Sequence, residues 1–179
     1  IIAAALYACK TLDPGNKIST SLPMQMVYVE AGDFEMGSFK GFIEERPAHF
    51  VSLTRNYFVA RIETTNSQLM DVLNWGIKNK KVIIEKNGVK NAEGQRQILI
   101  DIFDEDCGID FNGKYFIAKI GMEDFPCVEI SWYGAVMFCN LLSEIEGLTP
   151  VYDITNWNCD WELNSYRLPT EAEWEFASA

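Results

Sequence analysis

The sequence predicts an α+β domain made of short strands, two or three helices and long loops. Short apolar or alternating runs bounded by turn-forming residues indicate the strands. Two longer segments carry apolar residues at helical spacing, and each begins with a capping residue and ends near a glycine. The 179 residues are 48% hydrophobic and 13% aromatic, which is sufficient for the packed core of one domain.

Four strands are expected before the first helix. Residues 26–30 form the first, and residues 34–37 can return as its hairpin partner after a turn at residues 31–33. Residues 50–53 and 57–62 indicate two more strands, joined by a short polar turn.

The first helix is expected to follow Thr65, which can cap it, with Gln68 completing a capping box. It runs to about Trp75, and Gly76 is expected to end it. Its apolar face consists of Leu69, Val72 and Leu73.

The middle of the chain predicts strands at residues 82–84, 97–100 and 114–118. Acidic residues gather between the last two, at Asp101, Asp104, Glu105, Asp106 and Asp110. Oxygen ligands suit calcium, but the spacing does not match an EF-hand, so a solvated acidic loop is favoured.

The second helix begins after Ser131, its N-cap candidate, and ends at Gly147. Trp132 and Tyr133 in its first turn are expected to be core or lid residues. The apolar stripe consists of Ala135, Phe138, Cys139, Leu142 and Ile145, so Cys139 is expected to be a buried, inert thiol.

The last residues predict the start of a third helix. Thr170 can cap it, and Glu173 can close a capping box. The negative charges of Glu171 and Glu173 in the first turn are stabilised by the positive end of the helix dipole. Trp174 is expected in the core. Arg167 could pair with Glu171 or Glu175, or recognise a carboxylate, and the structural ion pair is favoured.

Charge and composition exclude some classes of function. The net charge of −11 argues against a nucleic-acid-binding face. No apolar run approaches the ~20 residues that span a bilayer. The single histidine, His49, is expected to make a structural hydrogen bond, because a zinc site needs clustered Cys and His.

The N-terminus predicts export and lipid anchoring. Residues 6–9 resemble a bacterial lipoprotein cleavage site, with Cys9 as the lipidated residue. Residues 1–8 would then be the end of a signal peptide, residues 9–23 a tether and residues 24–179 the domain. The alternative is a buried strand or helix carrying a free cysteine.

Cys107, Cys127, Cys139 and Cys159 remain once Cys9 is set aside. In an exported protein they could form two disulfides in any of three connectivities, among which the sequence does not choose. The chain begins with Ile1 and stops inside the helix that starts at Glu171, so we expect a piece of a longer protein, cut at both ends.

Four blocks of sequence, in order, resemble the formylglycine-generating enzyme family, also called sulfatase-modifying factor domains. They are residues 32–37, residues 45–53 with 62–66, residues 126–140 and residues 164–176. The family-signature residues within them are Glu63, Asn66, Ser131, Trp132, Arg167, Glu171, Glu173 and Trp174. The resemblance implies a C-type-lectin-like α+β fold with long ordered loops, here incomplete at its C-terminus.

The resemblance also implies two functions. Active members oxidise a cysteine of a sulfatase polypeptide to formylglycine with a copper-binding cysteine pair, and they hold calcium. Those residues lie beyond the closing signature, and none of the cysteines here matches them, so no catalytic, cofactor or metal residue is assigned. The alternative is a non-catalytic module of the bacterial envelope, held to the membrane only by its lipid anchor, that binds a surface ligand or builds an assembly. The oligomeric state stays open.

Overall fold

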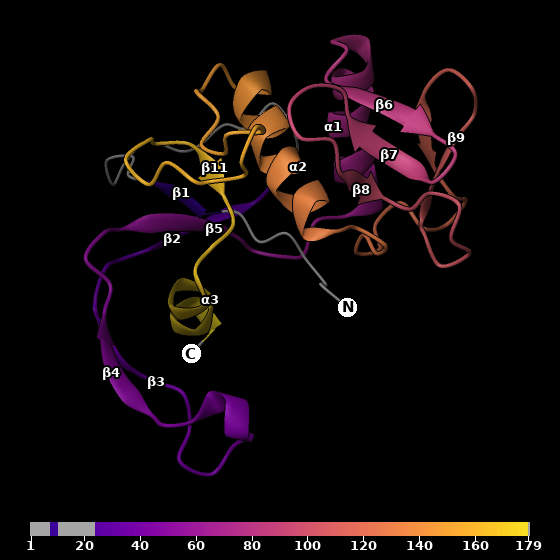
Figure 1. Cartoon of the computed structure of the whole chain (residues 1–179). Helices are drawn as coiled ribbons and strands as arrows, with labels where there is room; N and C mark the ends of the chain where they lie inside the picture. Colours follow the sequence, from indigo (N-terminus) through magenta and orange to yellow (C-terminus); the bar gives the residue numbers. More distant parts are fainter. Residues whose placement is uncertain (1–7, 11–23, 179) are drawn as a thin grey trace.

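A computed structural model describes residues 8–10 and 24–178, and it confirms the predicted mixture of short strands and few helices (Figure 1). The helices are α1 (Asn66–Lys78), α2 (Trp132–Ile145) and α3 (Glu171–Ser178), with a 3-10 turn η1 (Ile43–Glu45). The strands are β1 (Ala8–Lys10), β2 (Met26–Val29), β3 (Asp33–Met36), β4 (His49–Ser52), β5 (Tyr57–Ala60), β6 (Val82–Glu85), β7 (Gly88–Asn91), β8 (Ile98–Ile100), β9 (Ile109–Phe111), β10 (Phe116–Ala118) and β11 (Tyr166–Arg167).

The largest sheet has the order β11-β1-β5-β2, with antiparallel neighbours. β5 pairs with β1 on one side and β2 on the other, and all four of its residues are buried. The predicted hairpin between residues 26–30 and 34–37 is therefore wrong, because β2 pairs with β5, and β3 pairs with β4 instead. The predicted strands themselves are present.

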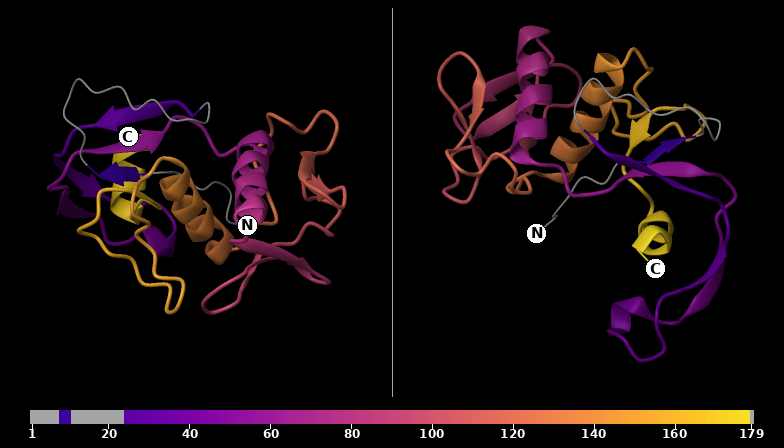
Figure 2. Two further views of the ribbon diagram at one scale, coloured as in Figure 1. Left: turned by 90° about the horizontal axis from the view of Figure 1, so that it is seen from above. Right: turned by 180° about the vertical axis from the view of Figure 1, so that it is seen from behind.

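Strands β3 and β4 form an arm that leaves the body of the molecule, and α3 lies beside its base (Figures 1 and 2). Phe34 of the arm packs on Phe176 of α3 with ring centroids 5.1 Å apart, and the backbone N–H of Gly37 donates to Glu175 at 2.7 Å. Four large apolar side chains of the arm are exposed: Phe39, Phe42, Ile43 and Phe50.

The core lies around α1 and α2. Helix α2 lies between the large sheet and the half of the molecule that holds α1 and the β6-β7-β8 sheet (Figure 1). The prediction that Gly76 ends α1 is wrong, since the helix continues to Lys78. Gly76 lies inside the helix, where an added Cβ would stand 3.1 Å from Leu141 and 3.2 Å from Val82. The glycine therefore allows α1 to pack closely against α2 and β6. It does not act as the stop signal that the sequence pattern predicts.

Two strands of the middle region were not predicted. β7 lies between β6 and β8, and its first residue, Gly88, has a φ of 122° that only glycine adopts readily. β9 pairs with β10 inside the segment predicted as an acidic loop. Both are too short and too polar to show the alternation that identifies longer strands.

Strand β1 bears on the predicted lipid anchor. Ala8 pairs with Val59 and Arg167, so the backbone around Cys9 lies inside the large sheet. This placement does not decide between the two predictions, because Cys9 and Lys10 pair with Phe58 and Tyr57 of β5 and cleavage before Cys9 would remove only Ala8 from the strand. The predictions on residues 1–7 and 11–23 lie outside the described residues, and lipidation of Cys9 stays a prediction. No helix in the described part is long and apolar enough to cross a membrane.

Candidate functional site

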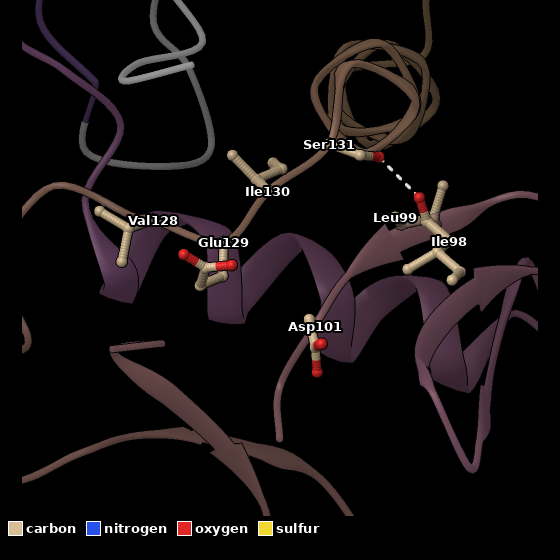
Figure 3. A pocket seen from close by; sticks show the side chains of 7 residues that line it. All are labelled: Ile98, Leu99, Asp101, Val128, Glu129, Ile130 and Ser131. Carbon is tan, nitrogen blue, oxygen red and sulfur yellow. Dashed lines mark hydrogen bonds between the residues drawn. The ribbon is translucent and has the colours of Figure 1, made fainter. Parts of the chain in front are cut away.

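A pocket of about 400 Å³ opens where β8 meets the loop that leads into α2 (Figure 3). Its lining is Ile98, Leu99, Asp101, Val128, Glu129, Ile130 and Ser131. An isolated antiparallel bridge joins Ile100 to Ile130, and the backbone N–H of Asp101 donates to the carbonyl of Glu129 at 3.1 Å. The segment before α2, which belongs to the third block of family resemblance, is thereby attached to β8 at the edge of the three-stranded sheet.

The start of α2 closes one side of this pocket. Ser131 caps the helix as predicted, since its hydroxyl accepts the backbone N–H of Gly134 at 3.0 Å. The same hydroxyl donates to the carbonyl of Ile98 at 2.6 Å, a contact drawn in Figure 3. Gly134 permits this approach, because a Cβ there would stand 2.1 Å from the carbonyl oxygen of Leu99.

Asp101 and Glu129 bring two exposed carboxylates to the mouth of the pocket. Glu129 has a φ of 58°, the left-handed region that non-glycine residues rarely occupy. Its neighbours Val128 and Ile130 supply apolar surface. An apolar hollow edged by negative charge suits the stem and cationic head of a lysine or arginine side chain.

The closing signature forms a buried ion pair. Arg167 donates to both carboxylate oxygens of Glu173, at 2.7 and 2.6 Å, so the expected partners Glu171 and Glu175 are wrong. Glu173 lies one turn into α3 and faces inward, while Glu175 bonds to Gly37. The ring of Trp161 stacks on the guanidinium with the charge 5.0 Å from its centroid.

The predicted capping box of α3 is confirmed. Thr170 donates its backbone N–H to Glu173 at 2.7 Å and accepts the Glu173 N–H at 3.1 Å. Burial raises the pKa of Glu173, but hydrogen bonds from Arg167 and Thr170 outweigh it, and the pKa lies below its ordinary value. Glu173 therefore stays ionised and holds β11 and α3 together.

The remaining signature residues have different surroundings. Thr65 and Gln68 form the capping box of α1, so Glu63, which is exposed, does not cap it. Asn66 is buried and donates to the carbonyl of Met122 at 2.8 Å, which fixes the loop before the pocket.

Trp174 is 52% exposed, so its predicted place in the core is wrong. It lines a groove between α3 and the large sheet, together with Val27, Val29 and Val59. Trp132 is half exposed and meets the rings of Tyr133 and Tyr152 edge-on, at centroid distances of 5.3 and 6.3 Å.

The thiols of the described region do not fit a copper centre. Burial raises the pKa of all four thiols, Cys107, Cys127, Cys139 and Cys159, and that of Cys127 reaches about 12. These thiols therefore stay protonated at neutral pH. Copper(I) binds the thiolate form. Within residues 24–178, no three His, Cys, Asp or Glu side chains gather to hold a metal ion. His49 is exposed, with Nδ1 2.9 Å from the carbonyl of Pro47.

A family model described as the sulfatase-modifying factor enzyme 1-like domain matches residues 14–179. The chain belongs to this family. The predicted family and its α+β fold are thereby confirmed, and the match covers both the pocket and the Arg167–Glu173 pair. No solved structure matches the chain significantly.

Parts of two kinds of curated protein are similar to this chain. The chaperone protein LppX of Paenibacillus barcinonensis is 28% identical over 98% of this chain and 51% of its own length. The serine/threonine-protein kinases pkn1 of Chlamydia caviae and Chlamydia pneumoniae are 28% and 27% identical, over 86% and 87% of this chain. Each of these kinases is covered over 19% of its length, so the chain spans about half or less of these relatives.

Sequence reasoning found the signature residues of this domain but missed the pocket. The sequence predicts Ser131 as a cap and Asp101 as part of an acidic loop, and it predicts no role for Glu129. The two carboxylates lie 28 positions apart in the sequence, and no local pattern joins them. Only the pairing of β8 with the segment before α2 brings them together.

Proposed function

We propose that this chain is the polypeptide-binding part of a sulfatase-modifying factor domain in the bacterial envelope. Its client is an unfolded segment of a protein such as a sulfatase. The pocket between β8 and the start of α2 supports this proposal, because it offers apolar surface edged by two carboxylates. Peptide segments that carry an arginine or lysine beside small apolar residues complement such a surface.

Sulfatase segments of the CxPxR type, which active members of the family modify, have this composition. The arginine of the segment would face Asp101 and Glu129, and its apolar residues would contact Val128 and Ile130. Oxidation of the client cysteine to formylglycine is the activity that the family implies. The four protonated thiols described above take no part in it, and we derive no step through copper or calcium.

A direct binding measurement tests this proposal. A fluorescent CxPxR-type peptide is titrated with the purified protein, and its anisotropy gives the Kd. We expect Asp101→Asn and Glu129→Gln each to weaken binding about tenfold, since a charge-assisted hydrogen bond contributes about 1.5–3 kcal/mol. Replacing the peptide arginine by glutamine should produce the same loss with the unchanged protein.

Glu105→Gln provides the matched control, because it removes one charge from the same acidic segment at an exposed position outside the pocket lining. It should leave the Kd within about twofold at 0.15 M salt, where distant charges are screened. Equal Kd values for Glu105→Gln, Asp101→Asn and Glu129→Gln would contradict binding at this pocket.

A second function, a non-catalytic chaperone-like module, is favoured by the match to LppX, which extends over 98% of the chain. Mass spectrometry of the peptide after incubation with the full-length protein separates the two functions, because the copper-binding cysteines of active members lie beyond the closing signature. Loss of the thiol with gain of an aldehyde supports the oxidase. Equal binding of cysteine and serine peptides, without conversion, supports the module. Its lipid anchor at Cys9 predicts that globomycin blocks processing of the full-length protein in the producing bacterium.

A further inference from the structure

We propose that the oxidised protein contains two disulfide bonds, Cys107–Cys127 and Cys139–Cys159. The sequence leaves three connectivities open, and the fold selects one of them. The inference is independent of the proposed function, since it concerns the framework and not the pocket. All four residues are free thiols in the structure, which is their reduced state.

The first pair meets beside the start of α1. Cys127 donates its backbone N–H to the carbonyl of Thr64 at 2.9 Å, and Pro126 forms an isolated bridge with Thr65. Cys107 reaches the same place from the other side: a Cβ on its neighbour Gly108 would stand 2.2 Å from the side chain of Asn66. Residues 64–66 therefore contact the chain next to both cysteines.

Burial and electrostatics agree with this placement. Cys107 and Cys127 are each 1% exposed and belong to one apolar cluster. Burial is the main cause of the raised pKa of Cys127, and charge on Cys107 raises it further. This direction agrees with the contacts that both segments make with residues 64–66.

The second pair meets beside Tyr152. The side chain of Asn140, next to Cys139 on α2, donates to the Tyr152 carbonyl at 2.7 Å and accepts its N–H at 3.1 Å. Cys159 forms an antiparallel bridge with Tyr152, so Cys159 and the residue next to Cys139 both contact Tyr152. Cys139 is fully buried, and after burial the largest cause of its raised pKa is charge on Cys159.

The crossed connectivities join different parts of the fold. Cys107 and Cys127 lie against residues that precede or begin α1, while Cys139 and Cys159 lie against Tyr152, whose hydroxyl accepts the N–H of Leu168 next to β11. A disulfide needs Cα atoms about 4.4–6.8 Å apart, which favours pairs whose members lie against the same residues over crossed pairs whose members lie against different ones.

Bond formation is ordinary thiol–disulfide exchange with a disulfide oxidant such as oxidised glutathione. A protein thiol loses its proton, its thiolate attacks the oxidant, and one oxidant thiol leaves. The partner thiolate then displaces the second oxidant thiol, so each protein bond forms as one oxidant disulfide is reduced to two thiols. Because burial disfavours the thiolates, we expect exchange during folding, before the core closes.

The test refolds the denatured, reduced protein in a buffer of reduced and oxidised glutathione. Free thiols are then blocked and the protein is digested without reduction. We expect mass spectrometry to find fragments joined through Cys107–Cys127 and Cys139–Cys159, and the whole chain to be lighter by four hydrogens. A folded product in which Cys107, Cys127, Cys139 and Cys159 are all blocked, or one with a crossed linkage as its main species, overturns the proposal.

Double variants provide the matched control. Cys107→Ala with Cys127→Ala should still lose two hydrogens through the remaining pair, whereas Cys107→Ala with Cys159→Ala should lose none. Bond formation between Cys127 and Cys139 in the second variant, with native circular dichroism, would overturn the pairing. The unsubstituted protein gives the linkage map even if a variant does not fold.

Discussion

Arg167 and Glu173 join the last strand and the last helix of the described chain through two parallel hydrogen bonds of 2.7 and 2.6 Å. Their side chains are 9% and 12% exposed, so water screens the pair little. Thr170 also donates to Glu173, and the ring of Trp161 covers the guanidinium. The signature segment thus connects β11 to α3. The charged groups of Arg167 and Glu173 are both occupied by these structural contacts.

Removing one partner of this pair should be costly, because the other charge remains buried without its counterion. We expect Arg167→Met and Glu173→Leu each to lower the free energy of unfolding by about 3–5 kcal/mol. Arg167→Lys should lose less stability than Arg167→Met, because it keeps the positive charge. It should still be less stable than the unchanged protein, because an ammonium group cannot form both hydrogen bonds in the same plane. Urea unfolding followed by circular dichroism measures the change.

The exposed pair Arg55–Glu162 is the control, with a distance of 3.3 Å and side chains 50% and 79% exposed. Arg55→Met should cost at most about 1 kcal/mol. Equal losses for Arg55→Met and Arg167→Met would show that the buried pair contributes no more than a surface pair.

The same carboxylate predicts a loss of stability in acid. The pKa of Glu173 is lowered in the fold from its ordinary 4.5, so as pH falls the unfolded chain takes up this proton first. Its contribution is fully present above pH 4.5 and disappears as pH falls through the lower, folded value. Unfolding free energies measured from pH 6 downward should fall more steeply in the unchanged protein than in Glu173→Gln.

Local chemistry made much of this fold predictable. Thr65 with Gln68, Ser131, and Thr170 with Glu173 all cap helices as expected, because a cap depends on residues within one turn. Strand pairing was not predictable in this way. β2 and β5 are partners separated by the whole β3–β4 arm, and no pattern in either strand specifies that order.

The candidate site was less predictable than the fold. Glu171, Glu173 and Glu175 all lie within reach of Arg167 in the sequence, and only the direction of α3 decides that Glu173 faces it. The size and apolar character of Trp174 predict a core residue, yet it is exposed, and the buried residue of α3 is its neighbour Glu173. The pocket depends on the bridge between Ile100 and Ile130, which is invisible to local patterns.

Gly134 should be intolerant of even one added methyl group. Its Cβ would stand 2.1 Å from the carbonyl of Leu99 and 2.6 Å from Ile130, so α2 would have to move away from β8. We expect Gly134→Ala to lower the free energy of unfolding by about 1–3 kcal/mol and to weaken peptide binding at the pocket. Gly121 has open space around it but a φ of 78°, so Gly121→Ala strains only its own turn and should leave peptide binding unchanged.

The two large aromatic residues of α3 should respond differently to truncation. Phe176 is half-buried against Phe34 and lies 3.2 Å from the position of a Cβ on Gly32, whereas Trp174 is 52% exposed. We expect Phe176→Ala to lower the thermal unfolding midpoint clearly and Trp174→Ala to change unfolding free energy by no more than about 0.5 kcal/mol. A larger loss for Trp174→Ala would place this tryptophan in a packed interior after all.

Tyr57 should make the protein sensitive to alkali. Its hydroxyl donates to the backbone carbonyl of Glu173 at 2.6 Å, and burial, with the nearby Glu173 charge, raises its pKa from 10.0 to about 12. The unfolded chain therefore loses this proton first as pH rises, so the stabilisation is complete below pH 10 and is lost towards pH 12.

Tyr57→Phe should be less stable at neutral pH by about 1 kcal/mol, the net contribution of one hydrogen bond. Between pH 10 and 12 its free energy of unfolding should fall less than that of the unchanged protein. Parallel curves over this interval would mean that the Tyr57 phenol titrates alike in the folded and unfolded states, and that its hydrogen bond to α3 does not form in solution.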